Sequence, residues 1–129
     1  IITDIASHQV DQFLHFTGST QGEVVASQIA NHHHPQYPKF QDFGDLMLRS
    51  NKGSGYIRVD WFTPDGLNTW GDGRLTILGT DGYIEVRKNT DIASPHGTGS
   101  HLYLVTNKET LYIDCKDVNL PHGFVESFP

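Results

Sequence analysis

The pattern of hydrophobic and polar positions changes once along the chain, close to Gly18. Up to that point, in TDIASHQVDQFLHF at residues 3–16, apolar positions recur with the period of an α-helix. One narrow arc of this helix carries polar side chains, namely Asp4, His8, Asp11 and His15. The opposite side is apolar and carries Ile5, Ala6, Val10, Phe13, Leu14 and Phe16. With Thr3 as a candidate N-cap and Gly18 as a left-handed C-terminal cap, the pattern predicts an amphipathic helix over residues 4–16.

After Gly18 the period shortens to two, which is typical of β-strands with one covered face. The clearest strand is YIRVDWFT at residues 56–63. Further strands are predicted at residues 23–31, 45–50, 74–78, 83–88, 101–106 and 110–115. The side chains expected to face a cover are Ile57, Val59, Trp61, Ile84 and Val86. The short turns between these segments, such as Asp81-Gly82, require antiparallel pairing.

These elements predict a single α+β domain over residues 1–129, with an N-terminal helix packed on a mostly antiparallel sheet of about six strands. The length is sufficient for one domain to bury a core without disulfides or metals. We find no internal repeat and no sign of a second domain in the sequence.

The amino-acid composition limits the kinds of molecule that the chain is expected to bind. The chain has 15 acidic and 9 basic residues without a basic cluster, which argues against nucleic acid. No apolar run approaches the roughly 20 residues of a membrane span. The single Cys115 excludes an internal disulfide framework and fits a reducing compartment, so we expect the cytoplasm. The chain opens at Ile1 without an initiator Met, and we interpret it as a fragment whose signal peptide, if any, lies upstream.

Two motifs have ordinary interpretations. A G-x-G occurs in GSGYIR at residues 53–58, but it opens a strand and not a helix, so we predict a turn and no cofactor loop. Successive residues of an extended chain point to opposite sides, so His32, His33 and His34 do not converge on one metal ion. We expect them in a solvated loop, with one of the three available to line a ligand cleft. We expect His96 and His101 to lie in a solvated loop as well.

Residues 67–73, LNTWGDG, combine Asn68, Trp70 and Asp72 between two strands. An exposed indole ring covers the apolar face of a sugar, while amide and carboxylate groups bind its hydroxyls. The alternative is a hairpin loop in which the Trp70 ring plugs the edge of the core. The sequence leaves both interpretations open.

Asp4 and His8 lie four residues apart on the predicted helix and are therefore neighbours on its surface. The carboxylate is able to fix the tautomer and orientation of the imidazole, as a partner of a general base does. The alternative is a solvent-facing polar stripe, in which Asp4 interacts with the positive end of the helix dipole.

The helix motif resembles one in the C-terminal domain of the glucose-fructose oxidoreductase, inositol dehydrogenase and rhizopine catabolism (Gfo/Idh/MocA) family. Its form, D-x-[GA]-x-H-x-x-D ending in Gly, is matched by Asp4, Ala6, His8, Asp11 and Gly18. GRLTILGTDGYIEV at residues 73–86 is similar to the family's strand-turn-strand G-x-L-x-I-x-G-T-x-G. The likeness covers nearly the whole chain, although strand patterns are less specific than the helix motif.

The resemblance implies a full-length NAD(P)-dependent oxidoreductase acting on a sugar, polyol or related carbohydrate alcohol. It implies that His8 takes the proton of the substrate hydroxyl and that Asp4 positions His8 or a neighbouring hydroxyl. Asp11 is assigned to local structure or the cleft wall, and His15 stays unassigned. The candidate substrate-binding residues of the loop at 67–73 are Asn68, Trp70 and Asp72, which we call the substrate lip.

Three features of the family are missing from the sequence: the G-x-G-x-x-G fingerprint, the E-K-P segment with its lysine, and the Gly-Gly before the helix. All three are expected upstream, so we expect this chain to bind no cofactor and to be inactive alone. The family's sheet commonly forms the oligomer interface, and we expect a homo-oligomer. The alternatives are a non-catalytic carbohydrate-binding or scaffold domain of the same fold, and a metallohydrolase using Asp4, His8 and a loop histidine.

Overall fold

The computed structural model describes residues 1–67, 69–89, 91–93 and 98–119 of the chain. The chain forms two compact units, Ile1–Phe62 and Thr63–Pro129, and each is considered by itself. Among the described residues, no helix has the length and apolar character needed to cross a membrane.

The first unit begins with the predicted helix, in two parts. A π-helical turn, η1 (Ile2–Ala6), leads into α1 (Ser7–Thr17). Gly18 adopts the left-handed conformation at φ 62°, and its amide donates to the His15 carbonyl at 3.1 Å, which confirms the predicted C-terminal cap. The predicted N-cap is wrong, because the helical backbone starts at Ile2 and places Thr3 inside the first turn.

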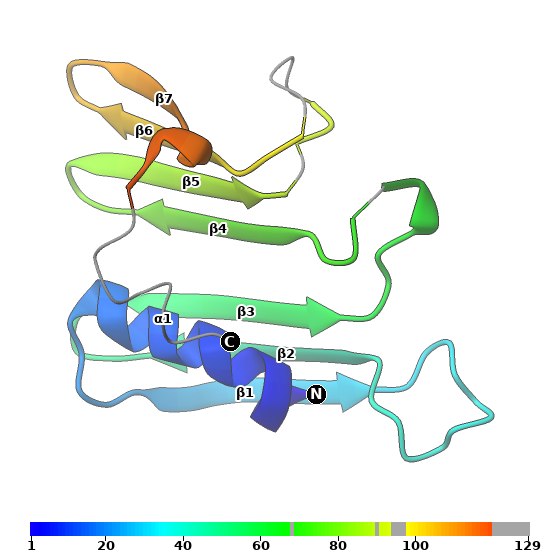
Figure 1. Cartoon of the computed structure of the whole chain (residues 1–129). Coiled ribbons are helices and arrows are strands. Elements are labelled where there is room, and N and C mark those ends of the chain that lie inside the picture. Colours follow the sequence, from blue (N-terminus) through cyan, green and yellow to red (C-terminus); the bar gives the residue numbers. More distant parts are fainter. Residues whose placement is uncertain (68, 90, 94–97, 120–129) are drawn as a thin grey trace. The chain divides into compact units, whose positions relative to one another are not determined.

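Three antiparallel strands form the sheet of this unit in the order β1-β2-β3 (Figure 1). They are β1 (Glu23–Ala30), β2 (Phe43–Arg49) and β3 (Ser54–Asp60). The Gly53 carbonyl accepts the Ser50 amide at 2.8 Å, so the G-x-G opens with a hairpin turn, as predicted.

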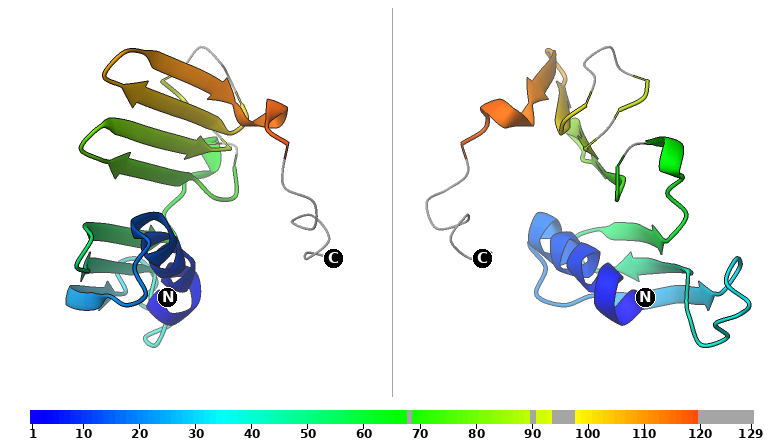
Figure 2. Two further views of the ribbon diagram at one scale, coloured as in Figure 1. Left: turned by 90° about the vertical axis from the view of Figure 1, so that its left-hand side faces the viewer. Right: turned by 45° about the vertical axis from the view of Figure 1, so that its right-hand side comes forward.

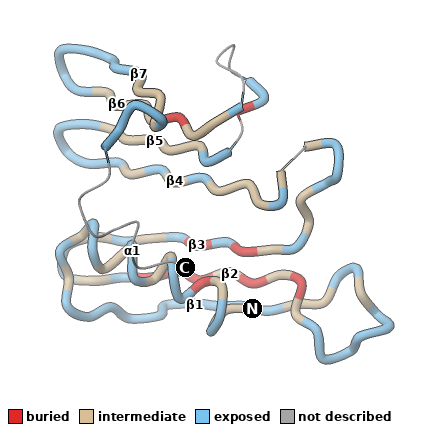
Figure 3. Tube along the Cα trace, in the orientation of Figure 1, coloured by how far each residue is buried: buried red, intermediate tan, exposed pale blue. Residues whose placement is uncertain are grey.

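The core of the first unit lies between the helix and β2 and β3. Its buried residues, marked in red on the trace of Figure 3, include Ala6, Leu46, Leu48, Ile57 and Val59. The helix approaches β3 so closely that a Cβ on Gly55 would lie 2.8 Å from Cδ2 of Phe13. Burial of Ile57 and Val59 confirms the predicted covered face. The expectation for Trp61 is wrong, because β3 ends at Asp60 and the Trp61 side chain is 42% exposed.

The second unit is a four-stranded antiparallel meander in the order β4-β5-β6-β7, shown from two further directions in Figure 2. Its elements are η2 (Asp65–Leu67), β4 (Gly73–Leu78), β5 (Gly82–Lys88), β6 (His101–Thr106), β7 (Thr110–Asp114) and η3 (Cys115–Asp117). Ile84 and Val86 share one face of this sheet and are half-buried.

The α+β class and the antiparallel pairing are confirmed. The strand arrangement differs from the prediction. We expected one sheet of about six strands, whereas the described strands form a three-stranded sheet and a separate four-stranded sheet. The physical reason lies in the segment after Asp60. Pro64 and the 3₁₀ turn that follows it take the backbone out of the extended conformation, so β3 and β4 are not joined by a tight hairpin.

Candidate functional site

The polar arc of the helix is exposed. Asp4 lies in η1, and His8 and Asp11 lie in α1, while Val10 and Phe13 on the other side pack on the sheet. Within the described parts of the chain, the side chains of Asp4, His8 and Asp11 make no hydrogen bond or ion pair. The main-chain carbonyl of Asp4 accepts a hydrogen bond from Ser7 Oγ at 2.5 Å. All three side chains are therefore accessible to a partner from outside this unit.

The π-helical turn ends between Asp4 and His8, so the regular α-helical spacing does not apply across this pair. Single π-helical turns are rare and occur frequently at functional sites. Asp4 and His8 are both exposed, but no hydrogen bond joins them in the described structure.

The other two positions of the helix motif have a role in folding. Ala6 is 1% exposed in the core, and Gly18 adopts a left-handed backbone. Folding therefore explains Ala6 and Gly18. Asp4, His8 and Asp11 are exposed, and Asp4 in the first helical turn also fits the positive end of the helix dipole.

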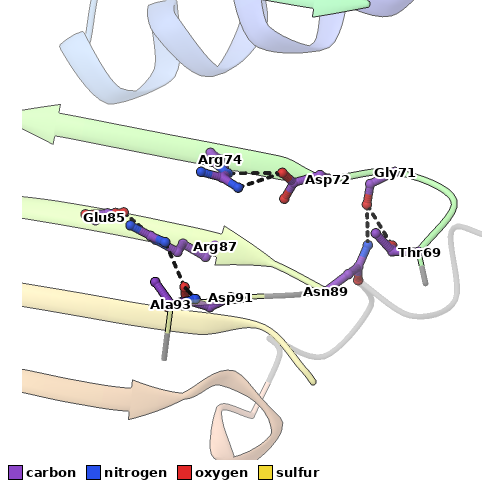
Figure 4. Close-up of polar contacts among 9 residues, drawn as sticks. All are labelled: Thr69, Gly71, Asp72, Arg74, Glu85, Arg87, Asn89, Asp91 and Ala93. Atoms are coloured by element: carbon purple, nitrogen blue, oxygen red, sulfur yellow. Dashed lines mark hydrogen bonds and ion pairs between the residues drawn. The ribbon is translucent and has the colours of Figure 1, made fainter. Parts of the chain in front are cut away.

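The loop before β4 belongs to the second unit and carries Trp70 and Asp72. The Trp70 side chain is 88% exposed, which does not fit the alternative of a ring that plugs the core edge. Oδ2 of Asp72 accepts from Nε of Arg74 at 3.1 Å and lies 3.0 Å from its Nη2, whereas Oδ1 is buried without a described partner (Figure 4). Asn68 lies outside the described residues.

The three consecutive histidines lie in a loop organised by a carboxylate. Asp42 is fully buried, and it accepts the amides of His32 and His33, each at 2.8 Å, and Nδ1 of His34 at 2.9 Å. Burial alone would raise the pKa of Asp42, but these hydrogen bonds and the His34 ring outweigh it and lower the pKa to about 2. His32 and His33 are exposed, as expected, but the solvated-loop expectation is wrong for His34 because Asp42 fixes its ring.

The expectation for His101 is also wrong. This residue begins β6, its side chain is 1% exposed, and its Nδ1 lies 2.8 Å from the Tyr112 hydroxyl. Tyr112 is on the neighbouring strand, so only the sheet register brings the two together. His96 lies outside the described residues.

A second buried carboxylate, Asp91, was missed by the sequence analysis. Arg87 donates from Nη1 to Oδ1 of Asp91 at 2.7 Å and from Nε to Glu85 at 2.6 Å (Figure 4). The Tyr103 hydroxyl donates to Oδ2 of Asp91 at 3.0 Å. Burial raises the pKa of Asp91, but these partners and the Ala93 amide lower it overall. The alternation of Glu85 and Arg87 on one strand was the available signal, since residues two apart share a face.

Within the described residues, no group of three or more His, Cys, Asp or Glu side chains is placed to hold a metal ion. The first unit presents an exposed imidazole, His8, and two exposed carboxylates, Asp4 and Asp11, on its helical segment. The second unit presents the exposed indole of Trp70 and the carboxylate of Asp72, which Arg74 holds.

Comparisons with known proteins identify the family and support the fold. Residues 1–85 match the family model described as the GFO/IDH/MocA C-terminal domain. The crystal structure of a "putative oxidoreductase" from Erwinia carotovora atroseptica SCRI1043 is similar, with 52% sequence identity and a TM-score of 0.82. The similarity covers 91% of this chain and 35% of that chain, so this chain spans about a third of that protein. No curated protein matches the sequence.

Proposed function

The chain belongs to the GFO/IDH/MocA family as a C-terminal domain, and on this premise we propose that the whole protein is an NAD(P)-dependent oxidoreductase. Its proposed substrate is a sugar, a polyol or a related carbohydrate alcohol. The observation that carries the proposal is the exposure of Asp4, His8 and Asp11, which have the residue types of the helix motif and lie in the segment that the family model matches. We place the protein in the cytoplasm.

His8 is the proposed catalytic base. An imidazole titrates near neutral pH, so it is able to take the proton of a substrate hydroxyl under physiological conditions. Its exposed position on α1 supports the role, because the ring is open to a molecule that approaches from outside the unit. Asp4, one turn earlier, is proposed to orient the His8 ring or a neighbouring hydroxyl, and Asp11 to form the cleft wall.

The nicotinamide, when bound, supplies the acceptor for the hydride that leaves the substrate carbon. The G-x-G of Gly53 and Gly55 leads into β3 and not into a helix, so it does not form the phosphate-binding turn of a dinucleotide fingerprint. We therefore assign cofactor binding to a Rossmann domain in the remainder of the protein. This chain contributes the base and the substrate contacts.

Trp70 and Asp72, with Asn68, are the proposed substrate lip. The exposure of the Trp70 ring supports this, since an aromatic platform needs an open face to stack on a sugar. Asp72 is held by Arg74, and a fixed carboxylate is a better acceptor for a sugar hydroxyl than a mobile one.

We also propose that the protein is a homo-oligomer that associates through a sheet face. The register of β4–β7 gathers eight aliphatic side chains on one face, none of which is buried: Leu75, Ile77, Ile84, Val86, Leu102, Leu104, Leu111 and Ile113. Leu111 is exposed and the other seven are half-buried, and an apolar sheet face that is not fully covered is a candidate interface.

Calorimetry with NADH tests whether the cofactor binds to this chain or to the remainder of the protein. We expect residues 1–129 to bind no NADH, and the full-length protein to bind with a dissociation constant on the order of micromolar. NADH binding by the 129-residue chain would contradict the assignment of the cofactor site. A full-length protein that binds neither NADH nor NADPH would favour the non-catalytic carbohydrate-binding or scaffold domain.

A further inference from the structure

Asn89, directly after β5, has an unusual backbone. Its φ is +71°, and it is the one non-glycine residue in the described part of the chain with a positive φ. Residues with a side chain seldom adopt this conformation, although asparagine does so more readily than most. A strained backbone conformation of this kind is retained only where surrounding contacts hold it in place. Residues with such a conformation cluster at functional sites.

Three hydrogen bonds fix Asn89. Its side-chain Nδ2 donates to the carbonyl of Gly71 at 3.1 Å, and its amide donates to Oγ of Ser100 at 3.4 Å. Its carbonyl accepts the amide of Gly99 at 3.2 Å. Asn89 thus connects the loop before β4 with the segment that enters β6.

Gly71 lies between the two candidate lip residues, Trp70 and Asp72. Its carbonyl also accepts the Thr69 hydroxyl at 3.0 Å, and Figure 4 shows the side chains of Thr69 and Asn89 both directed at it. On the other side, Asp72 is held by Arg74. The Trp70–Asp72 backbone is therefore anchored at its centre and at one end, while the Trp70 ring remains 88% exposed.

A fixed backbone under an exposed ring has a consequence for binding. An aromatic platform that is already ordered loses less conformational entropy when a sugar stacks on it, so the sugar binds more tightly. The side-chain amide of Asn89 reaches this loop from the end of β5.

We propose that Asn89 is a positioning residue that holds the Trp70 loop in the orientation required to bind the carbohydrate substrate. This inference rests on the proposed function, in which Trp70 contacts the substrate. It assigns to Asn89 no contact with the substrate itself.

The Asn89→Gly variant tests the proposal in the full-length protein. Glycine adopts a positive φ without strain, so the substitution removes the side-chain amide and leaves the backbone geometry allowed. Asn107→Gly is the matched control, because it makes the same chemical change in the exposed turn between β6 and β7. Asn89→Asp is a second variant, which replaces the donor with a carboxylate facing the Gly71 carbonyl.

Two measurements are made. With 5-fluorotryptophan incorporated, the ¹⁹F resonance of Trp70 is assigned by its loss in Trp70→Phe, and it should shift and narrow in Asn89→Gly but not in Asn107→Gly. With D-glucose and myo-inositol as probes, KM should rise about fivefold in both Asn89 variants, the equivalent of one lost hydrogen bond, with kcat within about twofold.

The outcomes separate the inference from the proposed function. Suppose that Trp70→Ala raises KM while Asn89→Gly changes neither the Trp70 resonance nor KM. The positioning role of Asn89 is then wrong, but the proposal that Trp70 contacts the substrate is retained. A changed resonance with an unchanged KM also overturns the role. If Trp70→Ala leaves KM unchanged, or neither probe is oxidised, the proposed lip fails and the inference fails with it.

Discussion

At the scale of single residues, the sequence identified exposed candidates but missed the buried polar groups. Asp4, His8 and Asp11 were found because helical spacing is local and visible in the sequence. The environments of Asp42 and His101 depend on partners brought close by loop closure and strand register, which a single sequence does not reveal. The sequence analysis considered the three histidines as a possible site, but it did not identify Asp42, whose carboxylate holds their loop in place.

Asp42 makes the stability of the first unit depend on pH. Its folded-state pKa of about 2 lies below the ordinary value near 4, so its contribution to stability is complete above about pH 4 and is lost as the pH falls towards 2. We expect Asp42→Asn to destabilise the protein at pH 6 and the difference from wild type to shrink between pH 4 and pH 2. Urea unfolding across this range measures it.

Asp45→Asn is the matched control for this prediction. Asp45 lies on β2, which begins directly after Asp42, and within the described residues its carboxylate bonds the exposed side chains of Gln28 and Tyr56. A pH dependence of Asp42→Asn equal to that of Asp45→Asn would contradict the role given to the buried carboxylate.

At the scale of elements, period and turn chemistry predicted the helix and the positions of the strands. Burial of Ile57 and Val59 follows directly from alternation on β3. The π-helical turn was not predictable, because the same residues satisfy an α-helical pattern. The error at Trp61 has a similar cause, since alternation does not show where a strand ends.

Gly18 tests the helix end. A Cβ at this position would meet only Lys52 Nζ at 3.5 Å, so there is space for a methyl group, but φ is +62°. Gly18→Ala should therefore destabilise the protein through backbone strain alone, by about 1 kcal/mol. Gly66→Ala, where a Cβ would meet no atom within 4 Å, is the control. Equal thermal stability of the two variants would show that the left-handed cap has no energetic role.

At the scale of the whole molecule, the sequence predicted the class and the family, but not the division of the strands into two sheets. Sheet membership depends on hydrogen bonds between strands, and Pro64 gave only a local signal of the break. The apolar face of β4–β7 leads to a prediction about assembly.

Ile84 lies on that face, with Ile77 and Leu104 beside it on the neighbouring strands. A glutamate at position 84 would place a charge in the proposed interface, so Ile84→Glu should lower the molar mass of the full-length protein to that of a monomer in light scattering. Thr110→Glu, on the opposite face of the same sheet, should leave the mass unchanged. A monomeric wild type, or an Ile84→Glu variant of unchanged mass, would contradict association through this face.

The central claim, that the exposed arc of the helix is a catalytic face, is tested most directly by the turnover of His8→Asn in the full-length enzyme. The His8 side chain is exposed, so folding and cofactor binding should be unchanged. Loss of a general base should lower kcat by about 10²- to 10⁴-fold. His15→Asn, on the same polar arc, should be close to neutral and serves as the matched control. Full turnover by His8→Asn on a sugar or polyol that the wild type oxidises would show that the arc is only the solvated side of a helix.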